Sequence, residues 1–573
     1  MNRSISRREL VTRAAQVSIG GALALNAGGF AVAADAVAVD RRKSSSGRSP
    51  QRAAGYASQT PAAVRNATVA GIQGALANHH YTVADLAGYY VARIHAIDQN
   101  GPELRSILEL NPEWAHLALA LDLQHGDPDT RGTLFGVPVV LKDNIDTADR
   151  MHTTAGSLAL LDSSPTRDAF IVRQLRRAGA LILGKANMSE WAGMRTFSAS
   201  SSWSGRGGLT RNPYAPERSP SGSSSGPGVA VAADLAAVAI GTDTGGSIAG
   251  PASVNGVVGV RPTVGLVSRS GIVPISKSQD TAGPLARTVA DAAAMLTVIA
   301  GYDPDDPATA RLKDQPPPDF RRALKKDSLK GTRIGVLRQY AGFNADVDEV
   351  FDRALATLRA QGAVLIDPVN IPTKGMFDDD SEVVQEYEFK DGIARYLATR
   401  VGPGPKTLAD LIAFNDEHAA TEMPYFGQGV FLSSERKGPL TDSVYRNALE
   451  RERRLAGPEG IDAALNKDHL DALIAPTSPP APLIDLVAVN RSGGGGGGHF
   501  TLVAAAAGYP RMTVPMGQVR GLPVGMTFVG TAWSDFKLIG LAYGFEQASH
   551  ARRPPGEVPV ALPDGSSRLL NWS

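Results

Sequence analysis

The chain contains no cysteine among its 573 residues. It therefore has no disulfide, no thiol nucleophile, no thiolate ligand for zinc or an iron–sulfur cluster, and no cysteine for a lipid anchor. A surplus of one charge is also lacking, because 58 Lys and Arg face 57 Asp and Glu. This balance disfavours a surface built to bind nucleic acid or anionic membrane. Any chemistry must use oxygen and nitrogen groups.

The composition is that of a large globular chain. Hydrophobic residues make up 43% and charged residues 20%, enough for one large domain or two to four ordinary ones. Thr82 with Asp85, and Thr288 with Asp291, have the spacing of helix capping boxes. Short β-rich runs alternate with such helical patterns, and this alternation predicts a mixed α/β fold. The predicted strands cover residues 137–141, 180–183, 238–242, 333–337, 473–474, 512–514 and 526–529.

The first forty residues have the pattern of an export signal. Residues 6–10 read S-R-R-E-L, a twin-arginine pattern, and an uncharged stretch rich in Ala and Gly follows. That stretch is too weakly apolar for a stable membrane span, and it ends in small-residue cleavage sites. We expect residues 1–39 to be a twin-arginine-type signal that directs the chain to the periplasm or the cell exterior. Residues 40–66 are typical of a flexible linker.

Several short motif matches are not supported by the residues around them. Residues 179–185 resemble a phosphate-binding loop, but their interior is an apolar strand rather than a glycine-rich cradle. The S-x-x-K at 434–437 lacks its K-T-G companion. The G-x-S-x-G at 222–226 would make Ser224 the nucleophile of an α/β-hydrolase. Such a nucleophile lies on a sharp turn between a strand and a helix, and the prolines and charged residues before this motif do not predict a strand. The α/β-hydrolase therefore remains only a minor alternative.

The histidines do not predict a metal site. No H-E-x-x-H motif or other close ligand pair occurs, and His79 and His80 are adjacent, so they cannot share one helix face. The ten histidines stand at positions 79, 80, 95, 116, 125, 152, 418, 469, 499 and 550.

The unusual chemistry lies in two places. A serine triplet at 223–225 is followed by Gly245-Gly246-Ser247, and a glycine pair before a serine can turn backbone N–H groups toward a developing oxyanion. Upstream, Lys142 directly follows five uncharged residues. If it is buried, desolvation lowers its pKa and supplies a neutral amine that can act as a base.

Taken together, these segments resemble the amidase signature family of serine hydrolases. The resemblance spans roughly residues 67–552, in order, and its motifs are specific. The segments that carry it are 136–145, 154–157, 184–190, 222–226, 241–248, 259–263, 283–288, 475–477, 514–517 and 521–525.

The resemblance implies a fold and a catalytic triad. The expected fold is a single large α/β domain at 67–552, a mixed sheet covered by helices, with a helical insertion at about 320–460 and a tail at 553–573. Ser247 is then the nucleophile, Ser223 the bridging serine in a cis peptide, and Lys142 the base. Ser223 is preferred to Ser224 because its offset from Ser247 matches the family.

The same resemblance implies the remaining parts of the site. The backbone N–H groups of Thr244, Gly245, Gly246 and Ser247 are expected to bind the oxyanion. No metal or other cofactor is expected, nor is nucleic acid, a membrane span in the mature chain or an obligate partner protein. Loops near Met188, Trp191 and the glycine run 493–498 are expected to line the substrate pocket.

Two departures from the family pattern point to one branch. Much of the family has Arg two residues after the nucleophile, where this chain has Ala249, and the glycine pairs around the serine triplet are altered. Both resemble bacterial peptide amidases, which remove C-terminal carboxamides and release ammonia. Further segments resemble that branch: 189–192, 203–208, 255–259, 276–283, 455–460 and 530–534.

The leading interpretation is therefore an exported serine amidase acting on peptide amides. Other carboxamides or aryl amides are the alternative substrates. A component of a tRNA-dependent amidotransferase and a non-catalytic binding protein on the same fold are the alternative classes.

Overall fold

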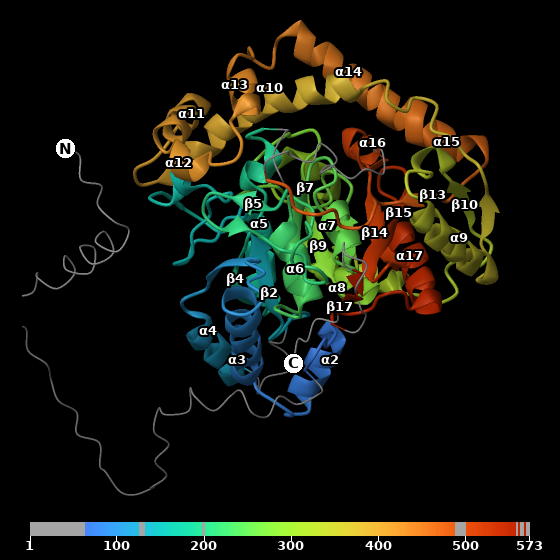
Figure 1. Ribbon diagram of the computed structural model, residues 1–573, viewed down its shortest axis with the longest axis horizontal. Helices are drawn as coiled ribbons and strands as arrows, with labels where there is room; N and C mark the ends of the chain where they lie inside the picture. The colour runs from blue at the N-terminus through green and yellow to red at the C-terminus, as the bar shows by residue number, and fades with distance from the viewer. Residues whose placement is uncertain are drawn as a thin grey trace, which may run out of the picture. The chain divides into compact units, whose positions relative to one another are not determined.

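The computed structural model describes residues 64–124, 132–196, 201–486, 500–556, 560–561 and 567–568. The predicted export signal, nearly all of the linker and the glycine run 493–498 lie outside these described residues. All seven predicted strands form, and they belong to one eleven-stranded sheet at the centre of the fold (Figure 1). The predicted α/β domain with a mixed sheet is confirmed.

The order of strands across the sheet is β1-β4-β2-β7-β9-β8-β14-β15-β13-β10-β11. In that order the strands are Ile107–Leu110, Leu181–Ala186, Pro138–Lys142, Val238–Asp243, Thr281–Ala286, Val258–Arg261, Arg511–Val519, Leu522–Val529, Ala472–Pro476, Arg333–Val336 and Val364–Ile366. Six two-residue strands form three small pairs: β3 (Ser164–Pro165) with β12 (Arg400–Val401), β5 (Trp203–Ser204) with β6 (Gly208–Leu209), and β16 (Val560–Ala561) with β17 (Ser567–Arg568).

Three parallel neighbours position the site. β4, β2 and β7 are parallel, and every residue of the three is buried, as the continuous apolar runs in their sequences predict. Because the carboxyl ends of parallel strands meet at one edge of a sheet, Lys142, Ala186 and Asp243 end their strands on the same side.

Four strands of the main sheet, β1, β8, β9 and β11, were not predicted, and two of them, β8 and β9, have sequences that look like turns. β9 contains Gly283 and Pro284, and β8 is only four residues long. Glycine is needed in β9, because a Cβ on Gly283 would lie 1.9 Å from the carbonyl oxygen of Val260 in β8. This close approach between strands is a tertiary constraint that strand propensity does not contain.

Some helices pack on the sheet, and a second group lies in the N-terminal part of the chain. α6 packs on β2 and β7, α7 packs on β8, β14 and β15, and α17 packs on β14. The helices of these two groups are α2 (Val69–Ala77), α3 (Val83–Arg93), α4 (Trp114–Gln124), α5 (Phe170–Arg177), α6 (Ser225–Ala232), α7 (Ala249–Val254), α8 (Val289–Ile299), α9 (Ala345–Ala360), α16 (Phe500–Ala506) and α17 (Asp535–Ser549).

The two predicted caps differ in detail. At α3, Thr82 and Asp85 form the full reciprocal capping box. At α8, Thr288 accepts the N–H of Asp291, but the Asp291 carboxylate accepts the N–H of Val69 at 2.7 Å instead of returning to the cap. The Asp291 carboxylate therefore links the start of α2 to α8, two segments that are far apart in the sequence.

The helical insertion is narrower than expected. Residues 333–366 contribute β10, α9 and β11 to the sheet layer, and the segment made mainly of helices, which also contains the short strand β12, begins at α10. Figure 1 shows α10 and α14 as long helices that lie side by side across one edge of the sheet. The helices of the insertion are α10 (Asp378–Leu397), α11 (Leu408–Glu417), α12 (Ala419–Glu422), α13 (Gly429–Glu435), α14 (Ser443–Ala456) and α15 (Ala463–Lys467).

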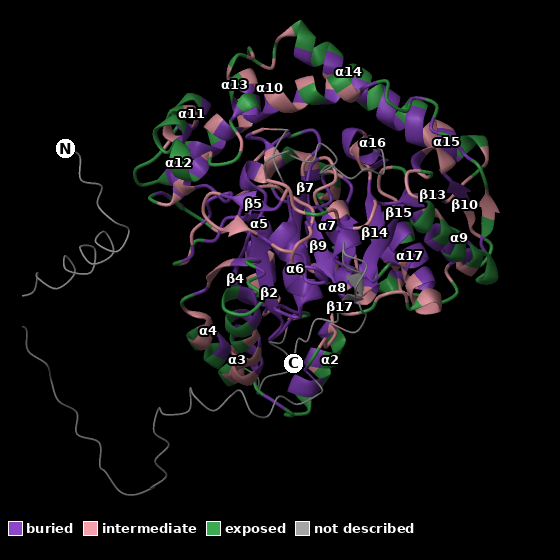
Figure 2. Cartoon of the chain, viewed as in Figure 1, coloured by how far each residue is buried: buried purple, intermediate pink, exposed green. Residues whose placement is uncertain are grey.

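Short 3₁₀ and π turns complete the described chain. The π turns are η2 (Ile94–Gln99) and η9 (Gly457–Asp462), and the 3₁₀ turns are η4 (Leu158–Leu160), η5 (Glu190–Gly193), η6 (Pro307–Leu312), η7 (Phe320–Ala323) and η8 (Arg338–Tyr340). Figure 2 shows the central strands buried, whereas α10, α14 and the N-terminal helices each expose one face. None of the described helices is long and apolar enough to span a bilayer.

Candidate active site

Lys142 is the last residue of β2, and its side chain is fully buried. Its Nζ lies 2.7 Å from Ser223 Oγ, 2.8 Å from Thr242 Oγ1 and 3.3 Å from the Thr242 carbonyl oxygen. Thr242 belongs to β7, which runs parallel beside β2. The fold thus joins the predicted base and the predicted bridging serine, which stand 81 residues apart in the sequence.

Burial decides the charge of this lysine. Desolvation lowers the pKa of Lys142 to about 7, although Asp243 and Asp280 act in the opposite direction. An amine that has lost one proton has two N–H donors and one lone pair. The Thr242 carbonyl and hydroxyl oxygens accept the two N–H groups, which leaves the lone pair facing the Ser223 hydroxyl. In this state Lys142 can accept a proton from Ser223.

The two adjacent serines have different surroundings. Ser223 precedes α6, and the peptide bond between Gly222 and Ser223 is cis, as the family resemblance implies. Ser224 is fully buried; its Oγ donates to the Thr242 carbonyl at 3.0 Å and accepts the Thr242 N–H at 3.2 Å. The Ser224 hydroxyl therefore links α6 to β7, and this geometry does not support an α/β-hydrolase nucleophile there.

Ser247 lies in the short loop between β7 and α7. Its carbonyl accepts the N–H of Ser224 at 3.1 Å, which holds its backbone against the serine loop. Among the described residues, the backbone N–H groups of Thr244, Gly245 and Ser247 have no acceptor. The Gly246 N–H instead donates to Asp243 Oδ1 at 3.2 Å. Three of the four expected oxyanion donors are thus available in this conformation.

Gly246 holds a backbone conformation that suits glycine alone. Its φ is +146°, and a Cβ at this position would lie 2.9 Å from Thr501 Oγ1. The neighbouring Gly245 has no positive φ, and a Cβ there would make only an ordinary contact with Leu502. The requirement for glycine is therefore stricter at the second position of the pair.

A buried carboxylate braces the same loop. Asp243 accepts the N–H groups of Gly246 and Ile248, the latter at 2.7 Å, and it pairs with Arg261 of β8 and Arg511 of β14. Burial by itself raises the pKa of Asp243, but the two guanidinium groups outweigh it and the net shift is downward. The sequence alone did not assign this role, because only the sheet brings both arginines to the end of β7.

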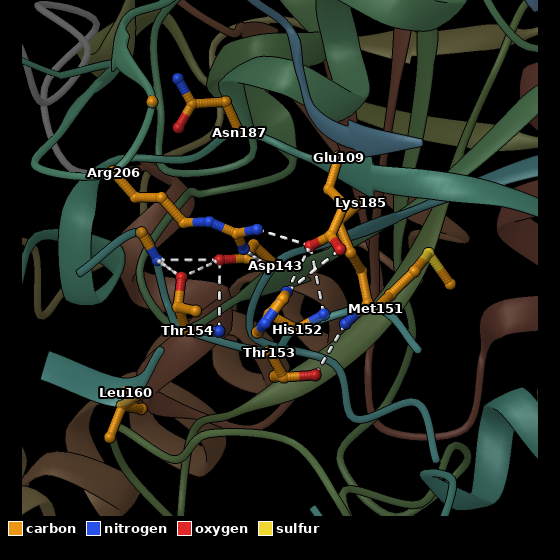
Figure 3. A network of polar contacts seen from close by, with 12 residues as sticks. Glu109, Asp143, Met151, His152, Thr153, Thr154, Leu160, Lys185, Asn187 and Arg206 are labelled. Atoms are coloured by element: carbon orange, nitrogen blue, oxygen red, sulfur yellow. Dashed lines mark hydrogen bonds and ion pairs between the residues drawn. The ribbon is translucent and has the colours of Figure 1, made fainter. Parts of the chain in front are cut away.

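A second network lies at the segment that follows β2, which begins with Asp143 (Figure 3). The Asp143 carboxylate accepts the N–H groups of Thr154 at 3.2 Å and Gly156 at 3.1 Å, and it also accepts the Thr154 hydroxyl. Arg206 bridges Asp143 and Glu109. These contacts fix the residue next to Lys142 and so restrict where the lysine side chain can lie.

Lys185 is a second buried lysine, at the end of β4, with a different task. Its Nζ donates to the Ile145 carbonyl at 2.6 Å and to Thr153 Oγ1 at 2.7 Å, and burial lowers its pKa. Its hydrogen bonds hold the loop after β2, and within the described residues it contacts neither Ser223 nor Ser247. Contact with a serine thus distinguishes Lys142 from Lys185.

Met188 and Trp191 have their side chains in the protein interior in this structure. Both are buried in a hydrophobic cluster that includes Phe389 of α10 and Phe431 of α13. Trp191 packs edge-on against Phe431, with ring centroids 5.8 Å apart. These side chains join the helical insertion to the loop before the serine triplet, a packing role that the sequence did not separate from substrate binding.

The described residues contain no group of three or more His, Asp or Glu side chains that could hold a metal ion. Of the predicted pocket loops, residues 493–498 lie outside the described part of the chain.

Comparison with known proteins places this geometry in a family. The Amidase family model matches residues 85–539. The peptide amidase of Stenotrophomonas maltophilia is 50% identical, with a TM-score of 0.81 over 85% of this chain and 98% of that chain. A probable amidase of Arabidopsis thaliana is 39% identical over 86% of this chain and 92% of its own length. A glutamyl-tRNA(Gln) amidotransferase component from Moorella thermoacetica is 36% identical over 82% and 94%. The chain therefore belongs to the amidase signature family of hydrolases, enzymes that act on amides.

Proposed function

We propose that this chain is a serine amidase that cleaves carboxamide C–N bonds through an acyl-enzyme on Ser247. The hydrogen bond of 2.7 Å between Lys142 Nζ and Ser223 Oγ carries the proposal, because both other N–H positions of the buried amine are occupied by Thr242. A lysine arranged in this way serves as a base rather than as a surface charge.

In the acylation step Lys142 accepts a proton from Ser223, and Ser223 accepts one from Ser247. Ser247 Oγ then attacks the amide carbonyl, and the oxyanion is bound by the free N–H groups of Thr244, Gly245 and Ser247. The relay returns a proton to the nitrogen as the C–N bond breaks. Ammonia leaves when the substrate is a primary amide.

Deacylation uses the same groups in reverse order. Water gives a proton to the relay and attacks the acyl carbonyl, and the collapse of this second intermediate restores the Ser247 hydroxyl. The product is a free carboxylate. No step in this scheme uses a group that the chain lacks.

For the substrate, we propose the C-terminal carboxamide of short peptides. The support is the 50% identity to the Stenotrophomonas maltophilia peptide amidase, which exceeds the 36% identity to the Moorella thermoacetica amidotransferase component. Aryl amides and other carboxamides are the next substrates to test.

The deciding experiment measures ammonia release from a short peptide amide by the purified chain and its variants. We expect Ser247→Ala to lower kcat/KM by about 10⁴-fold, because the nucleophile is lost. Ser224→Ala is the matched control, since among the described residues the Ser224 hydroxyl forms hydrogen bonds only with the backbone of β7. Equal release by Ser247→Ala and the parent enzyme would reject Ser247 as the nucleophile.

A second readout separates the other classes. A fluorophosphonate serine probe should label Ser247 in the parent chain and leave Ser247→Ala unlabelled. An unlabelled parent chain with no amide turnover would favour a binding protein on this fold. Labelling at Ser224 would revive the α/β-hydrolase alternative.

A further inference from the structure

A cavity of about 360 Å³ lies beside the catalytic lysine. Its lining includes Thr242, Thr244 and Asn144, but neither Ser223 nor Ser247. Thr242 is the shared wall: its Oγ1 lies 2.8 Å from Lys142 Nζ and 2.9 Å from Asn144 Nδ2. Neither catalytic serine lines the cavity, but it contacts Thr242, which holds the base, and Thr244, one of the expected oxyanion donors.

Two arginines in the lining of the cavity are paired with carboxylates. Arg167 pairs with Asp305 at 2.7 Å, and both side chains are about half exposed. Arg269 forms ion-pair hydrogen bonds with Asp306 at 2.8 and 2.6 Å. The lining also holds Lys277, for which no ion pair is found among the described residues, and Arg395, which pairs with Asp391.

The inner end is different, because it holds a carboxylate without an ion-pair partner. Asp280 accepts the Thr244 hydroxyl and the N–H groups of Ile275 and Ser276, and within the described residues no cationic group lies within 4.0 Å of it. Burial raises its pKa to about 6, so that it is mainly ionised at neutral pH. A partly buried carboxylate without an ion-pair partner favours a cation.

Asn144 supplies an independent sign of a missing ligand. Its side chain is 3% exposed, and its Nδ2 donates to Thr242. Its Oδ1 is buried without a hydrogen-bond donor among the described residues. Because Asn144 lines the cavity and a buried acceptor without a partner is costly, a ligand or water that donates a hydrogen bond is expected there.

We infer that the inner end of this cavity is a binding site for the ammonium ion, held by the Asp280 carboxylate and the free Asn144 oxygen. The inference rests on the proposed amide hydrolysis only for the source of the ion. Ammonia leaves the acyl-enzyme step as a neutral molecule, takes one proton from water and is then a small tetrahedral cation with four N–H donors. Such an ion satisfies both a carboxylate and an amide oxygen, and it can enter from the solvent-exposed end.

Occupancy of the site has a consequence for the base. Asp280 is one of the two carboxylates that raise the pKa of Lys142, the other being Asp243. The hydrogen bond from Thr244 and the charge of Arg269 lower the pKa of Asp280. The charge of Asp280 in turn raises the pKa of Arg261. An ammonium ion next to Asp280 cancels its attraction for the lysine proton. The product should therefore favour the neutral, active form of Lys142.

The first test is direct and needs no turnover. Ammonium chloride is titrated calorimetrically into the Ser247→Ala protein, with tetramethylammonium chloride as the control cation that has no N–H donor. We expect one saturable site for ammonium and none for tetramethylammonium. Asp280→Asn should weaken ammonium binding at least tenfold, and so should Ile275→Trp, which fills the cavity while keeping the carboxylate.

Asn144→Ala provides a third variant, should Asp280→Asn fail to fold. Binding that is unchanged in the variants that fold, or the absence of saturable binding in the parent, would overturn the inference. Potassium that binds as tightly as ammonium would overturn the assignment to an N–H donor. Because the titration uses a protein without the nucleophile, its result is independent of whether the chain hydrolyses peptide amides.

The second test uses the active enzyme and the pH dependence of kcat/KM. Replacing tetramethylammonium by ammonium at equal ionic strength should move the acid limb to lower pH. Ile275→Trp should have no such response, and in Asp280→Asn the limb should already lie at lower pH. If ammonium does not shift the acid limb of kcat/KM in the parent enzyme, the coupling between the site and Lys142 is contradicted.

Discussion

At the residue scale, two buried lysines near the ends of the adjacent strands β2 and β4 have different partners. Lys142 contacts Ser223 and Thr242, whereas Lys185 contacts the Ile145 carbonyl and Thr153. Burial lowers the pKa of both, so the pKa direction alone does not identify the base. The contact with a serine does.

This pair gives a matched prediction. Lys142→Met should lower kcat/KM by about 10²–10⁴-fold, because the general base is removed. Lys185→Met should cost about 1–3 kcal/mol of stability, since a buried carbonyl loses its donor, while the folded fraction keeps activity within about tenfold. Kinetics with a peptide amide and denaturant unfolding of both variants provide the measurement. Equal losses of activity would contradict the assignment of the base.

The pH dependence follows from the same residue. The neutral form of Lys142 is the base, and burial lowers its pKa to about 7. The value of kcat/KM should therefore rise with pH through a midpoint near 7 and fall about tenfold per pH unit well below it. Initial rates across the pH range test this, with circular dichroism at each pH to show that the protein stays folded. A flat profile through neutrality would show that no such base limits the reaction.

At the scale of elements, the loop between β7 and α7 is set by contacts from several strands. Asp243 holds two of its N–H groups, and Arg261 and Arg511 hold Asp243 from β8 and β14. These arginines brace the loop although Ala249 stands where much of the family has Arg.

The glycine pair in this loop allows a controlled comparison. Gly246→Ala should lower kcat by at least about tenfold, because a Cβ would meet Thr501 and the positive φ is unfavourable, so the oxyanion donors shift. Gly245→Ala should change kcat by no more than about twofold, since its Cβ meets only an ordinary contact. Steady-state kinetics of both variants, with melting temperatures, decide the matter. A larger loss for Gly245→Ala would show that the loop is positioned in another way.

The helical insertion is connected to the same loop. Glu388 of α10 accepts the hydroxyl of Ser276 at 2.6 Å and the N–H of Ser278 at 2.9 Å. Gln279 bonds to Glu452 of α14 through its side chain, and its carbonyl accepts a hydrogen bond from Arg261. The insertion thus reaches Asp243 through two intermediate residues, which gives the packed helices a structural link to the oxyanion loop.

At the scale of the whole molecule, the proposed export depends on residues 1–39, which lie outside the described part of the chain. The described hydrolase domain begins after the predicted signal, and the family match begins at residue 85. The double variant Arg7→Lys, Arg8→Lys should keep the protein in the cytoplasm, because the twin-arginine pair is the address that the export machinery reads. Cell fractionation with an activity assay measures this. An unchanged distribution would mean that residues 1–39 are not such a signal.

Much of this protein could be predicted from the sequence because the relevant information is local. The absence of cysteine restricted the chemistry to oxygen and nitrogen groups, short β-rich runs between helical patterns predicted the strands, and the motifs indicated the amidase family. The four missed strands, among them β8 and β9, and the narrower insertion show the limit of local patterns. Chain pairing, rather than propensity, makes strands of segments rich in Gly and Pro.

The tertiary structure decided what depends on burial and on distant partners. It gave Lys142 rather than Lys185 a serine partner, left Ser223 facing that lysine while Ser224 bonds to β7, and buried Met188 and Trp191 under the insertion. It also joined Arg511 to Asp243, which stand 268 residues apart. The physical reason is common to all of these: a side chain's pKa and hydrogen bonds depend on which groups the fold brings within a few ångströms, and the sequence alone does not contain those distances.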